Sequence, residues 1–269
     1  MVSGVAVDLR GRIHVAHRGY HPLVCFDPEG NFLGCTGETE IQPSVYYKLN
    51  RNPATAMGQK YWVHGLSADP WGNIWVTDVG RHIVMKFDPV GKLVLTLGKP
   101  DLSGESPELF NQPTHVLVTP AGEIYVSDGY GNSRIVQFST AGKYVRSWGR
   151  RGQGPGEFNI PHCLTMDARG RIYVADRGNS RIQVFDEKGD LLAEWPVPAP
   201  DGVHVLGDCL YVGAGQDNRI LKLDLDGRVL ASWGSKELLG YPHGICPDSE
   251  GNLYAAELLA NRATKLAAA

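Results

Sequence analysis

One sequence pattern recurs six times along the 269 residues of the chain, and this repetition restricts the fold more than any other feature. The three clearest copies span residues 63–98, 113–148 and 161–195, and weaker copies begin at residues 4, 201 and 242. One position of the pattern is aromatic in most copies and holds, in chain order, His14, Trp75, Tyr125, Tyr173, Tyr211 and Tyr254. The aromatic residues are 38 to 50 residues apart, so each copy is a unit of forty-odd residues with insertions between units.

Each copy has the pattern of short antiparallel β-strands. Apolar and polar residues alternate, and turn residues interrupt the alternation every eight or so positions. Turns with aspartate first and glycine fourth lie at residues 27–30, 186–189 and 224–227. Four such strands form a β-propeller blade, and six blades close into a ring that removes exposed strand edges. We therefore predict an all-β, six-bladed β-propeller, although the sequence does not show which segment provides the fourth strand of the sixth blade.

Composition agrees with one closed ring, so we expect a single domain over residues 1–269. With 26 basic and 29 acidic residues the net charge is −3, and no basic run is present, so nucleic acids and anionic membranes are not expected partners. No apolar run approaches the roughly 18 residues of a membrane span, and no signal peptide is visible. We expect a cytoplasmic monomer, with secretion as the alternative.

The cysteines also favour a reducing compartment. They are odd in number and lack CxxC spacing, so we expect mostly buried thiols: Cys25, Cys35, Cys163, Cys209 and Cys246. Only Cys25 and Cys35 are considered as a disulfide pair.

Three histidines occupy one position of the repeat in every second copy. His64, His162 and His243 each precede a small and then an aliphatic residue, and two of them follow proline. Because equivalent positions of a closed ring lie at the same height and radius, the three imidazoles should converge on the central axis. Three imidazoles with an open fourth position are typical of a catalytic zinc site. A structural residue would recur in all six copies, so the alternation favours a metal site.

Other polar positions of the repeat are better explained by structure. The remaining histidines lack the alternating register and are expected to be solvated or hydrogen-bonded: His14, His17, His21, His82, His115 and His204. The acidic residues after the Tyr-Val core recur in consecutive copies, which indicates that they hold turns: Asp78, Asp128, Asp176 and Glu257. The Asn-Ser-Arg-Ile segments at residues 132–135 and 179–182 recur in the same way.

Several segments make the chain resemble a known enzyme family. The blade pattern and the linker at residues 149–162 are similar to NHL repeats. Along nearly its whole length the chain resembles the peptidyl-α-hydroxyglycine α-amidating lyases. The segments that carry the resemblance are VSGVAVD…HRG (2–19), HGLSAD…WVTDV (64–79), VSDGYGNSRIVQFS (126–139), PHCLTMD…VADRGNSRIQVF (161–185) and PHGI (242–245).

The resemblance implies a reaction and a set of site residues. The family uses zinc to split a peptidyl-hydroxyglycine carbinolamide into a peptide amide and glyoxylate. Its zinc ligands correspond to the three histidines that the repeat register selects independently. Its catalytic tyrosine corresponds to Tyr130, which would accept the hydroxyl proton as general base. Its two active-site arginines correspond to Arg18 and Arg177, which share one register in blades 1 and 4, should face each other across the mouth of the ring and suit a carboxylate.

Two departures from the family concern calcium and a disulfide. In the family, a structural calcium ion is held by main-chain carbonyls that correspond to Val5 and Leu66 and by an aspartate after the third histidine. Gly244 stands in place of that aspartate here. Calcium prefers oxygen ligands with some carboxylate charge, so we expect calcium to be absent or weakly bound. One cysteine of a family disulfide corresponds to Gly131, and both losses suggest a microbial relative.

Other functions stay open alongside a zinc lyase acting on a peptide or a small molecule that carries a carboxylate. The same three-histidine site would suit a lyase for a small carbinolamide such as ureidoglycolate, or a metal-dependent hydrolase of an amide or lactone. Some NHL propellers are interaction scaffolds without chemistry. The alternating histidines and Tyr130 favour an enzyme over such a scaffold.

Overall fold

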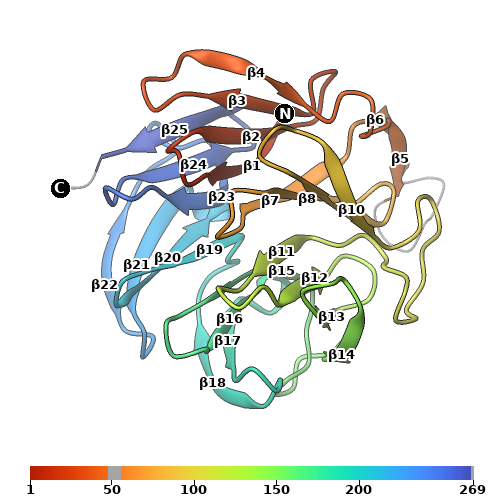
Figure 1. Ribbon diagram of the computed structural model, residues 1–269. Helices are drawn as coiled ribbons and strands as arrows, with labels where there is room; N and C mark the ends of the chain where they lie inside the picture. The colour runs from red at the N-terminus through yellow and green to blue at the C-terminus, as the bar shows by residue number, and fades with distance from the viewer. Residues whose placement is uncertain (48–55, 268–269) are drawn as a thin grey trace.

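The computed structural model describes residues 1–47 and 56–267, and these form the six-bladed β-propeller predicted from the repeats (Figure 1). Five blades are four-stranded antiparallel sheets and the sixth has three strands. The strands of blades 1, 2 and 3 are β1 (Val2–Val7), β2 (Ile13–His17), β3 (Leu23–Phe26), β4 (Phe32–Thr36); β7 (Val63–Ala68), β8 (Ile74–Asp78), β9 (Ile83–Phe87), β10 (Leu93–Leu97); β11 (His115–Val118), β12 (Ile124–Asp128), β13 (Arg134–Phe138) and β14 (Tyr144–Trp148).

The second half of the ring continues the same order. The strands of blades 4, 5 and 6 are β15 (Pro161–Met166), β16 (Ile172–Asp176), β17 (Arg181–Phe185), β18 (Leu191–Pro196); β19 (Gly202–Leu206), β20 (Cys209–Ala214), β21 (Arg219–Asp224), β22 (Val229–Trp233); β23 (Pro242–Pro247), β24 (Leu253–Glu257) and β25 (Arg262–Leu266). A separate hairpin of β5 (Ser44–Tyr47) and β6 (Ala56–Lys60) lies between blades 1 and 2. Short 3-10 turns, η2 (Arg177–Asn179) and η3 (Gly215–Asp217), follow the second strands of blades 4 and 5.

The first strand of every blade lines the hub. These strands contact one another in a closed cycle, β1 to β7, β11, β15, β19, β23 and back to β1. Apolar side chains fill the spaces between neighbouring blades, as in the cluster that joins Tyr173 and Val184 of blade 4 to Val203 and Leu210 of blade 5. The hub therefore brings the first strands of all six blades together, and this is where the alternating histidines lie.

The turn and acidic positions behave as predicted. The Gly30 amide donates to the Asp27 carbonyl at 3.0 Å, and Gly30 has φ +89°, a conformation that glycine adopts without strain. Asp128 is fully buried, accepts a hydrogen bond from the main-chain amide of Asn111 at 2.8 Å and pairs with Arg134 at 3.0 Å. In blades 3 and 4 the recurring acid and the arginine of the Asn-Ser-Arg-Ile segment thus hold the blade to the linker before it.

The disulfide considered between Cys25 and Cys35 does not form. All five cysteines are free thiols. Cys35 lies opposite Val24 and Cys25 lies opposite Gly34 in the β3–β4 pair, so the two cysteine side chains project from opposite faces of the sheet.

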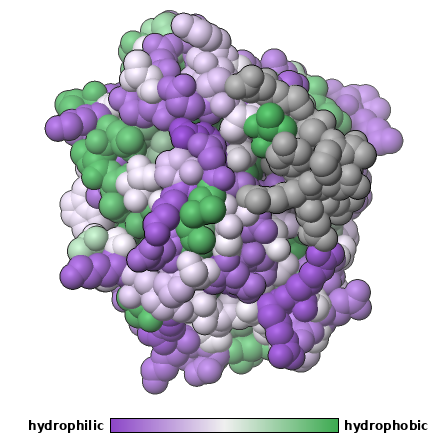
Figure 2. Space-filling model, turned by 90° about the vertical axis from the view of Figure 1, so that its right-hand side faces the viewer, coloured by the Kyte–Doolittle hydropathy of each residue, from purple (hydrophilic) through white to green (hydrophobic). Residues whose placement is uncertain are grey.

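The surface is mixed in polarity. On the face shown in Figure 2, hydrophilic residues are interspersed with small hydrophobic patches. Within residues 1–47 and 56–267, no helix has the length and apolar character that a membrane-crossing helix requires.

Candidate metal centre

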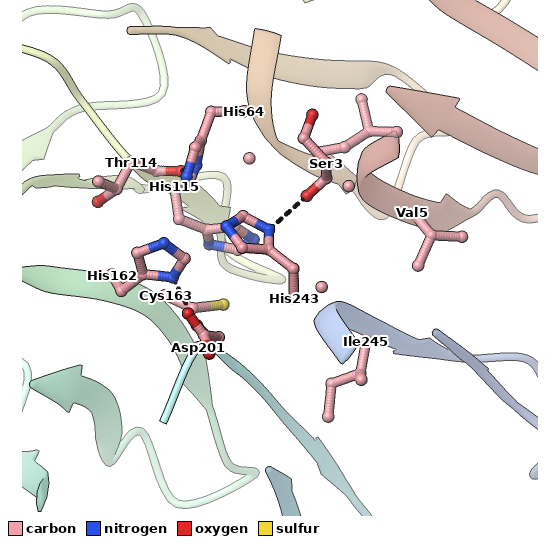
Figure 3. Close-up of a pocket in the computed structure, with 14 residues that line it drawn as sticks. Ser3, Val5, His64, Thr114, His115, His162, Cys163, Asp201, His243 and Ile245 are labelled. Carbon is pink, nitrogen blue, oxygen red and sulfur yellow. Dashed lines mark hydrogen bonds between the residues drawn. The ribbon is translucent and has the colours of Figure 1, made fainter. Parts of the chain in front are cut away.

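The three alternating histidines meet at the hub. His64, His162 and His243 project from β7, β15 and β23, the first strands of blades 2, 4 and 6. All three side chains are buried, and one ligand nitrogen from each lies within 4.8 Å of the others. Figure 3 shows the three imidazole rings close together in the hub. The arrangement predicted from the repeat register is therefore present.

Main-chain carbonyls of the intervening blades orient each imidazole. Nδ1 lies 2.7 Å from a carbonyl oxygen in all three cases, and the pairs are His64 with Thr114, His162 with Asp201, and His243 with Ser3. A carbonyl only accepts, so each Nδ1 carries the proton and donates it, which leaves the Nε2 lone pair directed to the hub. The acceptors are the aligned residues of blades 3, 5 and 1. Alternate blades thus supply the histidines and the carbonyls that orient them.

The histidines are held in the neutral state that metal binding requires. Burial lowers the pKa of His64 and His162 well below the usual value, and it lowers the pKa of His243 to about 3. The positive charges of Arg18 and Arg177 lower the pKa of His64 and His243 further.

Tyr130 closes one side of the histidine group. It lies in the loop after β12, and its hydroxyl oxygen is 2.9 Å from Nε2 of His64 and 3.1 Å from Nε2 of His162. One hydroxyl hydrogen can satisfy only one of these two nitrogens at a time. The site therefore holds more buried nitrogen lone pairs than hydrogen-bond donors to satisfy them. A bound cation would satisfy the remaining lone pairs.

Arg177 lies over Tyr130 and is anchored by a buried carboxylate. Its guanidinium carbon is 5.5 Å from the centre of the Tyr130 ring, and Nη1 is 3.0 Å from Oδ1 of Asp201. Burial alone would lower the pKa of Arg177, but Tyr130 and Asp201 raise it above its usual value, so the guanidinium stays charged. The ion pair fixes the direction of this cation beside the histidines.

Arg18 is held in a different way. Its guanidinium carbon lies 5.3 Å from the centre of the Trp62 ring, and Nε donates to the carbonyl of Val63 at 3.2 Å. Val63 directly precedes His64, so Arg18 of blade 1 lies beside the histidine group. Arg177 of blade 4 lies beside the same group through its contact with Tyr130.

Comparison with known proteins gives the family. The NHL-repeat family model matches residues 110–138 and 158–185. A peptidylglycine alpha-amidating monooxygenase of Rattus norvegicus is 40% identical in an alignment of 198 positions, gaps included, that covers 68% of this chain and 20% of that protein. Peptidyl-alpha-hydroxyglycine alpha-amidating lyase 2 of Drosophila melanogaster is 30% identical in an alignment of 291 positions, gaps included, that covers 98% of this chain and 70% of that protein. The chain belongs to the peptidyl-α-hydroxyglycine α-amidating lyase family.

The lengths of the relatives differ from that of this chain, which spans about a fifth of the rat protein. Among solved structures, a streptogramin B lyase superposes with a TM-score of 0.66 at 16% identity, covering 100% of this chain and 83% of that chain. At this identity the likeness concerns the fold alone.

The donor set fits the zinc ion that membership of the amidating lyase family implies. Three neutral imidazole nitrogens are suitable zinc ligands, and the hydrogen bonds from Nδ1 to main-chain carbonyls are the outer contacts that commonly orient such ligands. His64, His162 and His243 would hold the ion, with the Tyr130 hydroxyl beside it.

The calcium ion of the amidating lyases fits less well. Val5, Leu66 and Gly244 line a hub cavity of ≈20 Å³ beside the histidines, which has room for one water molecule or ion. The only carboxylate in its lining belongs to Asp201, which is engaged by Arg177. His115 also lines the cavity and presents a nitrogen, a poor calcium donor.

Sequence reasoning missed several residues of the site. Asp201 was noticed only as a non-histidine in the alternation, although an acid at a position held by serine and threonine in the other odd blades is a detectable signal. Trp62 carries no repeat signal. His115 was expected to be solvated or hydrogen-bonded, and it does form a hydrogen bond with the main chain of Leu66. Its Nδ1, however, is buried in the hub without a partner among the described residues. Burial lowers the pKa of His115 to about 4.

A second group of possible metal donors lies on the surface of blade 1 and consists of His21, Cys35 and Glu38. The side chains of His21 and Glu38 are 55% and 44% exposed and are hydrogen-bonded to each other. Mutual pairing already explains their proximity, so this group is a suitable control for the buried site.

Proposed function

We propose that the protein is a zinc-dependent lyase that cleaves the carbon–nitrogen bond of a carbinolamide of the peptidyl-α-hydroxyglycine type, giving an amide and glyoxylate. The observation that carries this proposal is the meeting of three buried imidazole nitrogens and the Tyr130 hydroxyl at one point of the hub. The name of the Drosophila relative supports the same reaction.

Tyr130 is positioned to move the proton that the reaction requires. The carbinol hydroxyl loses a proton, the carbon–oxygen double bond forms as the carbon–nitrogen bond breaks, and the departing nitrogen gains a proton. Tyr130 in its ionised form can accept the hydroxyl proton and return it to the nitrogen, so the proton count balances. A zinc ion held by the histidines would act as a Lewis acid that makes the carbinol hydroxyl more acidic.

The two arginines would give the site its preference for an anionic substrate. A planar guanidinium binds a carboxylate through two parallel hydrogen bonds. Arg177 is held by Asp201 and Arg18 by Trp62, so neither cation has to be ordered when substrate arrives. We assign to them the carboxylate that becomes part of glyoxylate. The amide side of the substrate is then free to be a peptide or a smaller group.

Product analysis tests the reaction. Zinc-loaded protein is incubated with a synthetic N-acyl-α-hydroxyglycine, and glyoxylate and the acyl amide are quantified against a protein-free reaction. We expect equal amounts of both products. The matched substrate without the hydroxyl, the N-acylglycine, should not be cleaved.

The other candidate functions give different products. Release of the carboxylic acid from the N-acylglycine, or opening of a lactone without glyoxylate formation, would replace the lyase by a hydrolase. Turnover of ureidoglycolate but not of N-acyl-α-hydroxyglycines would assign a small substrate. If the zinc-loaded protein turns over none of these compounds, the enzymatic proposal is wrong and a scaffold function is favoured.

A further inference from the structure

A second tyrosine lies on the far side of the carboxylate that anchors Arg177. The Tyr241 hydroxyl donates to Oδ1 of Asp201 at 3.5 Å, and Nη1 of Arg177 contacts the same oxygen at 3.0 Å. The centroid of the Tyr241 ring lies 6.4 Å from that of the His243 imidazole. A phenolic hydroxyl and a guanidinium therefore flank one buried carboxylate at the edge of the histidine group.

The main chain fixes the position of Tyr241. Its amide donates to Oδ1 of Asn218 at 3.0 Å, and its carbonyl accepts from the amide of Leu258 at 3.0 Å. Its φ of +66° is left-handed, a conformation that a bulky residue adopts only where the surroundings impose it. Ile160, which lies two residues before the histidine of blade 4, has φ +60°. The two blades thus share this turn, and the side chain with a hydroxyl group is what distinguishes blade 6.

Glycine at residue 215 leaves the space that the Tyr241 ring occupies. The turns η2 and η3 follow the second strands of blades 4 and 5, and their first residues are Arg177 and Gly215. A Cβ atom at Gly215 would lie 2.3 Å from Cε1 of Tyr241. Because blade 5 has no side chain at this position, blade 6 can place its tyrosine beside the Asp201 carboxylate.

Asp201 does not fully engage the Tyr241 hydroxyl. A distance of 3.5 Å is long for a hydrogen bond between two oxygen atoms, which is usually about 2.7–2.8 Å. The carboxylate has closer donors, since Arg177 contacts Oδ1 and the amide of Gly215 donates to Oδ2 at 3.1 Å. The hydroxyl can therefore turn to a nearby acceptor while Asp201 keeps these two partners.

A carboxylate bound to Arg177 would be such an acceptor. Asp201 contacts one terminal nitrogen of Arg177, whereas a guanidinium has five N–H donors. A substrate carboxylate has about four lone-pair sites, so two hydrogen bonds from an arginine leave sites for a further donor. The Tyr130 hydroxyl lies at the histidine nitrogens, and the Tyr241 hydroxyl lies on the Asp201 side of the guanidinium. The two hydroxyls thus serve different parts of one substrate.

We propose that Tyr241 is a third donor of the carboxylate-binding site, beside Arg18 and Arg177, and that its hydroxyl turns from Asp201 to the substrate carboxylate on binding. This inference rests on the proposed function, which assigns the carboxylate of the glyoxylate half to the two arginines. A hydrogen bond to a charged acceptor is stronger than one to a neutral acceptor. Tyr241 therefore increases the preference for a free carboxylate over an uncharged amide at the same position.

Binding of an uncleaved substrate analogue tests the proposal without requiring turnover. The probes are N-benzoylglycine and the uncharged N-benzoylglycinamide, titrated into zinc-loaded protein and followed by calorimetry. In Tyr241→Phe, which keeps the ring beside Gly215, we expect Kd for N-benzoylglycine to rise about 10–100-fold and Kd for the amide to change much less. The control is Tyr144→Phe, which removes an exposed hydroxyl on β14 and should leave both values unchanged.

A double-mutant cycle separates a substrate contact from support of Asp201. If the Tyr241 hydroxyl contacts the substrate, Tyr241→Phe should weaken binding of N-benzoylglycine about tenfold in the Asp201→Asn background as well. No further loss in that background would show that Tyr241 acts only through Asp201, and the proposal would be overturned.

Three other results would also overturn it. They are no binding of N-benzoylglycine to the unmodified protein, an unchanged Kd in Tyr241→Phe, and equal weakening of the acid and the amide, which would indicate a change in the shape of the site. Tyr241→Ile copies the residue of blade 4 and gives the same comparison if Tyr241→Phe does not fold. A protein that binds N-benzoylglycine through Tyr241 but does not cleave N-acyl-α-hydroxyglycines would keep this inference and lose the proposed reaction.

Discussion

The carboxylate of Asp201 lies 3.0 Å from Nη1 of Arg177, while the main-chain carbonyl of Asp201 accepts a hydrogen bond from His162 at 2.7 Å. The equivalent residues Ser3 and Thr114 use their hydroxyl groups differently. Each donates to the main-chain carbonyl of the residue that precedes the next blade's histidine, at 2.8 and 2.7 Å. The threefold pattern of the hub is thus broken at one position, where an acid replaces a hydroxyl and anchors a cation beside Tyr130.

Replacing Asp201 separates its two roles. Asp201→Asn removes the charge that holds Arg177 but keeps the main-chain carbonyl that orients His162. We expect kcat/KM for a carboxylate-bearing substrate to fall about 10–100-fold, mainly through KM, because a charge-assisted hydrogen bond contributes about 1.5–3 kcal/mol. Bound zinc per chain should stay unchanged. The control is Asp226→Asn in an exposed turn, and equal kcat/KM in both variants would remove Asp201 from substrate binding.

Metal binding should depend on the hub histidines alone. His162→Ala leaves two ligands, so we expect zinc content after dialysis to fall from about one ion per chain to a small fraction. His21→Ala disrupts the surface group and should leave the content unchanged. Elemental analysis of both variants at matched concentration measures this. Equal zinc in His162→Ala and unmodified protein would show that the ion binds elsewhere.

Tyr130 should affect turnover but not folding or metal content. Tyr130→Phe keeps the ring under Arg177 and removes only the hydroxyl, so the general base is lost. We expect kcat to decrease about 10²–10⁴-fold with an unchanged melting temperature and unchanged zinc content. Undiminished kcat in the zinc-loaded variant would exclude the tyrosine from proton transfer.

Structural features that recur in several copies of the repeat could be predicted from the sequence. The histidine group could be predicted for the opposite reason, because histidine occupies its position only in every second copy. The blades, the turns at Asp27 and the pairing of Asp128 with Arg134 follow from patterns present in several copies. The convergence of the histidines follows from ring closure. Tyr130 was assigned to the site only through the family resemblance. It lies in a loop, and its position in the repeat does not indicate that its side chain reaches the hub.

What the sequence could not show depends on contacts between distant segments. The carbonyls that orient the histidines are invisible in a residue pattern because every residue has one. Trp62 supports Arg18 from a segment outside the repeat. Cys25 and Cys35 are close in sequence but project from opposite faces of one sheet, which only strand register reveals.

Residue 65 should have to be glycine, because the Thr114 carbonyl that orients His64 leaves no room for a side chain there. A methyl group at Gly65 would lie 2.4 Å from the Thr114 carbonyl oxygen, whereas one at the equivalent Gly244 would meet its nearest neighbour at an ordinary 3.4 Å. We expect Gly65→Ala to lower the free energy of unfolding by about 1–3 kcal/mol through overpacking and to weaken zinc binding about 10–100-fold. Gly244→Ala is the matched control. Denaturant unfolding and zinc titration measure both effects, and equal behaviour of the two variants would contradict the argument.

Gly244 should also decide whether the hub binds calcium. The cavity near Val5 and Leu66 offers calcium no uncommitted carboxylate, so little offsets the cost of dehydrating a doubly charged ion. We therefore expect the melting temperature of the unmodified protein to be insensitive to millimolar calcium and to a calcium-selective chelator. Gly244→Asp restores the residue that the family resemblance implies, and the backbone there accepts a Cβ atom, which would meet only ordinary contacts.

An ion that binds only the folded state stabilises it in proportion to the logarithm of its excess over Kd, by about 2.7 kcal/mol at a hundredfold excess. The melting temperature of Gly244→Asp should therefore rise with calcium concentration, and Gly244→Asn, which has the same shape without the charge, should respond much less. Calcium-dependent stabilisation of the unmodified protein would show that other oxygen atoms of the hub replace the missing carboxylate. Failure of Gly244→Asp to respond would show that a carboxylate at residue 244 is not sufficient, and that the hub carbonyls are arranged differently from those of the calcium-binding relatives.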